Sequence, residues 1–221
     1  MNFGVQPIPD NEIFAVFRGD RLEYQSNDGE GGLFWDVQAW GGTDYSKLWF
    51  KSEGFWLFDK ETFEEAGVEL FYSRNIATFW DLQAGVRHDF EPHPTRTFAA
   101  LGIEGLARYW FEVDVTAYIS QDGDLSANLE AEYDLLLSQR LILQPRFEID
   151  VAVQEVEELS IGQGINDIEL GARLRYEIRR EFAPYIGVSW SRKLGETADL
   201  AEADGESIET TSLVAGIKFW F

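Results

Sequence analysis

A chain of 221 residues can form one large domain or two small ones, and the absence of cysteine excludes disulfide frameworks and thiolate metal sites. The formal net charge of −22 argues against nucleic acid as a partner, since phosphate binding requires clustered Lys and Arg. No apolar run approaches the ~20 residues that a membrane-spanning helix needs.

Residues 1–12 are predicted to form a short lead before a single folded unit that spans 13–221. The chain begins Met1-Asn2-Phe3-Gly4, without the basic and apolar regions of an export signal. If the protein is exported, we therefore expect this sequence to be a mature or trimmed form.

Strand-like stretches follow one another from near the amino terminus to the last residue, with no helical period between them. There are about twelve, an even number as in bacterial single-chain transmembrane barrels. Their predicted ranges are 13–25, 33–41, 45–56, 64–74, 78–90, 96–105, 109–120, 125–136, 139–151, 167–179, 182–193 and 208–221.

The alternation of the last stretch indicates what kind of sheet this is. One of its faces carries Thr211, Leu213, Ala215, Ile217, Phe219 and Phe221, and the other is mixed and largely small or polar. Barrel strands present apolar residues to lipid and mixed residues to a lumen, although the strands of a soluble sheet also alternate. The predicted fold is all-β: a closed antiparallel up-and-down transmembrane barrel.

The connections between the predicted strands alternate in length. Every second one is short, around 42–43, 75–76, 106–108, 138 and 180–181. The others are longer and polar, at 26–32, 57–63, 91–95, 121–124, 152–166 and 194–207. Outer-membrane barrels have short periplasmic turns and longer outer loops, so the pattern predicts both termini at the periplasmic rim.

The first strand does not follow the alternation. Arg18 and Asp20 share their parity with Leu22 and Tyr24, so charged and apolar side chains would fall on one face. We therefore predict either a β-bulge or a shorter span in this strand.

Charged residues on the polar faces of the seventh to tenth strands are predicted to line the lumen. Near the periplasmic end we expect Asp134, Arg140, Arg175 and Glu177. Nearer the middle we expect Asp114, Glu130, Glu132, Arg146 and Arg173. An alternative is that these ions pair with one another and simply fill the lumen. Barrels of ~8 strands are filled by side chains and those of ~16 strands enclose a water channel, so about twelve strands is compatible with either.

Several long segments carry a resemblance to a known family. They read WDLQAGVR at 80–87, GLA at 105–107, YWFEVD at 109–114, EAEYDLLL at 130–137, QRLILQPR at 139–146 and RYEIRREFAPYIGV at 175–188. With these segments the chain resembles the copper resistance protein B family of outer-membrane proteins. The resemblance implies a barrel in the bacterial outer membrane that takes part in copper tolerance or copper passage.

One feature of that family is absent from this sequence. Its members often carry an amino-terminal extension rich in Met and His, whereas this chain has one Met and two His. Cu(I) favours thioether and thiolate ligands, so the residues present offer little for a dedicated Cu(I) site.

The two histidines flank the third outer loop and are the candidate copper ligands. Imidazole suits Cu(II), and Asp89 or Glu91 could add oxygen ligands beside His88 and His93. His88 shares parity with Val86 and should face outward near the aromatic belt, which makes His93 the better candidate. The alternative is an interfacial histidine and a solvated loop histidine without a metal.

We therefore expect a non-enzymatic outer-membrane protein that passes or handles copper through a charged, acidic lumen. Its expected partners are membrane lipid, copper ions and a periplasmic copper-handling protein, and no cofactor is expected. One alternative is a barrel hydrolase acting on lipid, which would need an outward Ser–His pair with an orienting group. Another is a structural barrel with a plugged lumen.

Overall fold

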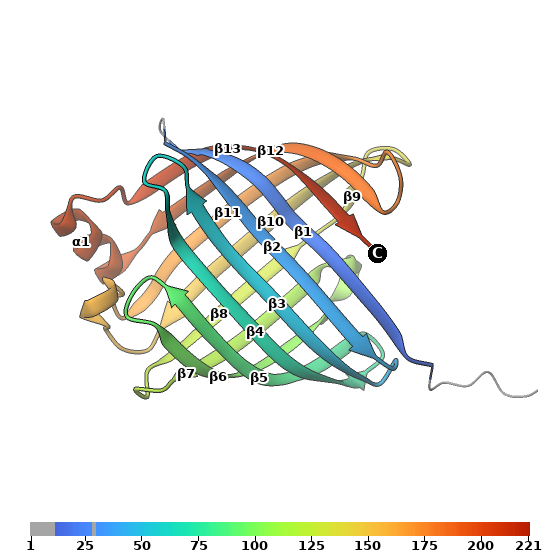
Figure 1. The fold of residues 1–221 in the computed structure, drawn as a ribbon, viewed down its shortest axis with the longest axis horizontal. Coiled ribbons are helices and arrows are strands. Elements are labelled where there is room, and N and C mark those ends of the chain that lie inside the picture. Colours follow the sequence, from blue (N-terminus) through green and yellow to red (C-terminus); the bar gives the residue numbers. More distant parts are fainter. Residues whose placement is uncertain (1–11, 28–29) are drawn as a thin grey trace, which may run out of the picture.

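The computed structural model describes residues 12–27 and 30–221. The expected lead at 1–12 thus lies almost wholly outside the described residues. The described part forms one antiparallel sheet that closes on itself (Figure 1). Its strands are β1 (Phe14–Asn27), β2 (Glu30–Gly42), β3 (Ser46–Leu57), β4 (Thr62–Ala77), β5 (Trp80–Glu91), β6 (Arg96–Leu106), β7 (Glu112–Ser120), β8 (Leu125–Glu132), β9 (Leu135–Leu136), β10 (Leu141–Ala152), β11 (Gly164–Tyr176), β12 (Phe182–Lys193) and β13 (Glu209–Trp220).

The barrel closes between its first and last strands, as predicted. β1 pairs antiparallel with β13, from Arg18 opposite Trp220 to Asn27 opposite Ser212. The Phe221 N–H donates to the Phe17 carbonyl at 2.8 Å, and the Phe17 N–H donates back at 3.0 Å. Because β8 and β9 both pair with β10 and replace one predicted strand, the fold is the expected twelve-stranded barrel. Closure leaves no open sheet edge in the described part of the barrel.

The two rims of the barrel differ in their connections (Figure 1). At the short-turn rim, which also holds both ends of the described chain, strands are joined through 43–45, 78–79, 107–111, 137–140 and 177–181. At the long-loop rim the longest connections are 153–163 and 194–208. The predicted alternation of loop lengths is thus confirmed only for these two loops, because 58–61, 92–95 and 121–124 at the same rim are no longer than the longest turns of the other rim. The assignment of the short-turn rim to the periplasm stays a prediction.

A helix in the last long loop corrects the sequence interpretation, which found no helical segment. Helix α1 (Gly195–Asp204) lies where a longer polar connection was expected at 194–207, and its C-cap Gly205 has a left-handed conformation. A short 3₁₀ turn, η2 (Glu157–Leu159), occupies the neighbouring loop. Within the described residues, no helix is long and apolar enough to span a bilayer.

Two predicted strands are shorter than expected. The segment 109–120 begins as a strand only at Glu112, because Tyr109 and Trp110 adopt positive φ within the 3₁₀ turn η1 (Arg108–Trp110). The segment 125–136 is divided into β8 and β9. Tyr133 lies between them and donates its N–H to the Pro145 carbonyl at 3.2 Å. Pro145 has no N–H to return, so the ladder is interrupted at this point.

The predicted irregularity in β1 is a β-bulge. Gly19 and Arg21 pair with consecutive residues of β2, which leaves Asp20 unpaired on that side, and the register against β13 also shifts here. An extra residue of this kind reverses the alternation beyond it. As a result Asp20 and Arg21 both lie on the inner face, and Leu22 and Tyr24 lie on the outer one.

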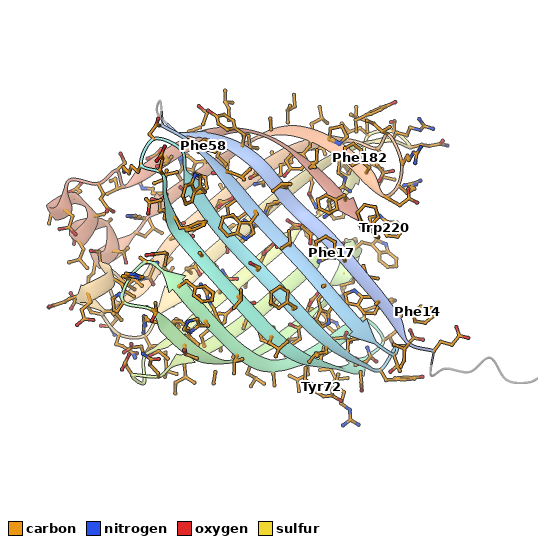
Figure 2. All side chains as sticks on the ribbon, viewed as in Figure 1. Phe14, Phe17, Phe58, Tyr72, Phe182 and Trp220 are labelled. Carbon is orange, nitrogen blue, oxygen red and sulfur yellow. The ribbon has the colours of Figure 1, made fainter. Side chains whose placement is uncertain are left out.

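Apolar residues occupy the outer face along the strands. In β6, Phe98 and Ala100 are buried, whereas Ala99, Leu101 and Ile103 on the alternate positions are exposed. Figure 2 labels six aromatic side chains on the outer surface, all of them at least 40% exposed: Phe14, Phe17, Phe58, Tyr72, Phe182 and Trp220.

The interior is divided into two parts. Inside β3 to β7, buried aromatic side chains pack into one cluster of Trp49, Phe71, Phe98 and Tyr118 with Ala100. A smaller cluster of Phe34, Phe55 and Leu57 lies inside β2 and β3. The inner faces of β8, β10, β11 and β1 instead carry mainly ionised side chains, and these form the candidate site.

Candidate functional site

Arg146 is surrounded by four carboxylates on three neighbouring strands. Its guanidinium nitrogens lie 3.0 Å from Glu130, 3.4 Å from Glu132, 2.6 Å from Glu148 and 3.4 Å from Glu169, and its side chain is 1% exposed. The cross-strand register of β8, β10 and β11 places these residues on the same inner face.

Three of the four carboxylates around Arg146 form a row of like charges, whereas Glu132 lies opposite Arg146 itself. Glu148 lies directly opposite Glu130 on one side and opposite Glu169 on the other. Like charges at directly opposite positions destabilise a sheet, so Arg146 offsets an unfavourable arrangement. The next row towards the long-loop rim continues the pattern, with Asp150 opposite Asp167 and with Asn128 donating to Glu148 at 2.7 Å.

A second buried group joins β11 and β12 to β1. The Arg173 guanidinium donates to both oxygens of Glu23, at 2.9 and 2.7 Å. The Tyr185 hydroxyl donates to the same carboxylate at 2.9 Å. Glu23 is fully buried. The guanidinium therefore binds the carboxylate through two charge-assisted hydrogen bonds in fork geometry.

Arg21 connects the charged part of the interior to β2 and β3. Its guanidinium lies 3.3 Å from both Asp36 and Glu53 and stacks over the Phe34 ring at 4.3 Å. The Glu53 side chain remains 53% exposed although it shares the inner face with Arg21. Unfilled space therefore adjoins this carboxylate inside the wall.

The remaining predicted lumenal residues lie in different places. Asp114 faces inward and contacts Lys51 of β3 at 3.0 Å. Towards the short-turn rim, Arg175 and Asp134 pair at 2.6 Å. The other two lie at that rim itself: Arg140 is exposed in the turn before β10, and Glu177 pairs at 2.8 Å with the exposed Arg180.

The structure does not bring the four candidate copper ligands together. His88 lies on the outer face, where its Nδ1 is 2.8 Å from the Thr97 hydroxyl and its ring contacts Phe90. Asp89 faces the other way and accepts from Arg87 at 2.7 Å. At the long-loop rim, His93 lies 3.4 Å from Glu91 and is 72% exposed. Across 12–27 and 30–221, no three His, Asp or Glu side chains are grouped as a metal site.

Several interior charges were not named among the lumenal residues predicted from the sequence. Glu148 and Glu169 beside Arg146 are two of them, and a further set lies on β1, β2, β3 and β13: Arg18, Asp20, Arg21, Glu23, Asp36, Lys51, Glu53 and Lys218. The irregular parity of β1 was the available signal, because a bulge after Gly19 places Arg21 and Glu23 on the lumenal face.

Solved structures with the same architecture define the class of this protein. The chain is similar to the NanC porin, with a TM-score of 0.59 and 12% identity over 93% of this chain and 99% of that one. It is similar to the KdgM porin with a TM-score of 0.55 and 11% identity, over 94% and 99%. Likeness at this level of identity concerns the fold alone. With an apolar outer face around a charged interior, the fold is that of an outer-membrane β-barrel.

Sequence relatives identify the family. Residues 13–221 match the family model described as Copper resistance protein B precursor (CopB). Copper resistance protein B of Escherichia coli is 45% identical over 97% of this chain and 72% of its own length. The homolog from Pseudomonas syringae pv. tomato is 41% identical over the same shares. The chain belongs to the copper resistance protein B family and is a protein of the bacterial outer membrane.

Proposed function

We propose that this barrel passes copper ions across the outer membrane through its charged interior, without catalysing a reaction. The observation that carries the proposal is the concentration of carboxylates on the inner faces of β8, β10 and β11, where one guanidinium is shared among four of them. Negative charge in a low-dielectric channel raises the local concentration of cations. The half-exposed Glu53 carboxylate of β3, paired with Arg21, adds to the negative charge of the same interior.

Passage of an ion does not require a fully formed metal site. Conduction requires binding that is favourable enough for entry and weak enough for release. A wall of carboxylates meets this requirement, since each oxygen contributes a modest attraction that salt screens. Residues that hold copper tightly would slow the flow.

We further propose that the long-loop rim faces the outside and that the histidines there assist capture. His93 with Glu91 would meet incoming Cu(II) before the acidic wall does, with a weaker contribution from His88 and Asp89 on the two faces of β5. In this orientation the short-turn rim would face a periplasmic copper-handling protein, and the outer face would contact lipid.

The test compares the acidic wall with the histidines. Barrels carrying Glu130→Gln with Glu132→Gln should lose more Cu²⁺ selectivity in liposomes than barrels carrying His88→Ala with His93→Ala. The difference should shrink at high salt, because screening weakens a collective field. Arg146 keeps two partners in the first variant, Glu148 and Glu169, so folding should survive.

Two results would contradict this proposal. If the histidine variant loses all copper dependence while the glutamate variant behaves as the parent, a discrete site governs passage. If the parent passes no ions, the lumen is plugged and its charges have a structural role. Folding of each variant is checked beforehand by the different gel mobility of heated and unheated samples.

A further inference from the structure

One ion pair crosses the barrel instead of following its wall. The Lys51 ammonium of β3 lies 3.0 Å from an oxygen of Asp114 on β7, and 3.8 Å from Glu104 on β6. Along the wall, β4, β5 and β6 separate β3 from β7. Lys47, on the same strand, pairs instead with Asp81 of β5, only one strand beyond its neighbour β4.

The position that the Lys51 ammonium occupies has the features of a cation site. Besides the two carboxylates, the Trp49 and Phe71 rings lie 5.9 and 5.5 Å from the ammonium, within cation–π range. Neighbouring donors orient both carboxylates. Thr116 donates to Asp114 at 2.9 Å, and the Gln83 amide nitrogen donates to Glu104 at 2.6 Å.

The ion pair of Lys51 does not account for the buried amide oxygen of Gln83. Its side chain is 1% exposed, yet its amide oxygen accepts no hydrogen bond in the described part of the chain. A buried amide oxygen without a partner carries a desolvation penalty. The oxygen shares its amide carbon with the nitrogen that donates to Glu104, so it is an unpartnered oxygen that the Glu104 hydrogen bond brings to this group.

We propose that Lys51 is a tethered cation that occupies a binding position for a mobile divalent cation, formed by Glu104, Asp114 and Gln83. The bound ammonium closes this side of the lumen by joining β3 to β7. A divalent ion competes for the same oxygens with twice the charge, and Lys51 has a flexible stem that lets its ammonium move away. This inference deepens the proposed copper passage and rests on it.

Binding of Cu²⁺ to purified protein in detergent tests the position directly. Lys51→Met should bind Cu²⁺ about three- to tenfold more tightly than the parent, because the Lys51 ammonium no longer competes with the ion for the carboxylate oxygens. Adding Glu104→Gln and Asp114→Asn should abolish that gain. Lys47→Met is the matched control, because it removes a lysine of similar exposure from the same strand without opening the cross-barrel pair.

Conductance across lipid bilayers tests the consequence for passage. Lys51→Met should raise Cu²⁺ conductance more than Lys47→Met does. Equal effects of the two variants on both conductance and affinity would overturn the inference. If neither the parent nor any variant conducts, the proposed passage fails, while the binding measurement still decides whether Lys51 occupies a cation position.

A measurement on the parent protein removes the dependence on variant folding. Displacement by Cu²⁺ should expose the Lys51 amine, so an amine-reactive reagent should label Lys51 several-fold faster with Cu²⁺ than without it, as followed by mass spectrometry. Lys47 should show a smaller change. A labelling rate at Lys51 that does not respond to Cu²⁺ would overturn the inference.

Discussion

Removing one partner of the Glu23–Arg173 ion pair should be among the most destabilising changes available in this barrel. Glu23 is fully buried and accepts four hydrogen bonds, two from Arg173 and one each from Tyr185 and Gln25. Truncating one member of a buried pair leaves the other charge uncompensated, which costs about 3–5 kcal/mol. We therefore expect Glu23→Gln and Arg173→Met each to lower the free energy of unfolding by that amount.

The double variant distinguishes an ion pair from two independent contacts. With both charges removed, no uncompensated ion remains, so the loss should be about 1–3 kcal/mol instead of the sum of the single losses. Urea unfolding in lipid vesicles, followed by Trp fluorescence, measures each value. Arg192→Met is the control, because Arg192 lies 3.6 Å from Glu209 in a half-exposed pair that should contribute about 0–1 kcal/mol. Additive losses, or single losses below those of the control, would refute the reasoning.

Two further predictions concern the outer face and the packing of the wall. Leu170→Arg should lower the free energy of unfolding by about 2–4 kcal/mol because Leu170 is an exposed outward residue of β11, whereas Tyr109→Arg in a rim turn should change it by about 0–1 kcal/mol. Equal losses in urea titrations would show that the lipid-facing depth is assigned wrongly. Gly216→Ala should cost about 1–3 kcal/mol, since its Cβ would lie 2.6 Å from a backbone carbonyl oxygen of β1. An unchanged urea midpoint would contradict that packing.

The strands were predictable from the sequence because alternation is a local property. In a run such as the one ending at Phe221, the two faces can be assigned from the order of residues alone, whatever strands lie beside it. The division between β8 and β9 was not predictable in this way. It depends on Pro145, which is remote from Tyr133 in the chain and meets it only when β10 is in register.

Helix α1 was missed for a similar reason. Its sequence is acidic and has no apolar stripe, and its only buried residues are Thr197 and Ala201. Contacts with the other long loop hold it in place: the Gly162 N–H donates to the Thr197 hydroxyl at 2.9 Å, and the Gln163 N–H donates to Glu196 at 3.0 Å. The local signal was a glycine suited to a helix end.

For the interior, parity assigns a face but not a partner. It placed Glu130, Glu132 and Arg146 on one side of their strands, and the structure brings these three into contact. It could not pair Lys51 with Asp114, because that contact depends on the curvature of a closed barrel. Which charges meet across the interior is a property of strand number and tilt.

The bulge at Asp20 allows the length of β1 to change by one residue without reversing its two faces. An insertion or deletion in a regular strand turns every residue beyond it to the opposite face. At Asp20 the chain already holds one residue more than its neighbour β2, and this residue contacts Arg18 and Lys218 inside the barrel. Deletion of Asp20 would therefore remove one lumenal charge and leave the other residues of β1 on the faces they now occupy. The lipid-facing surface would not change.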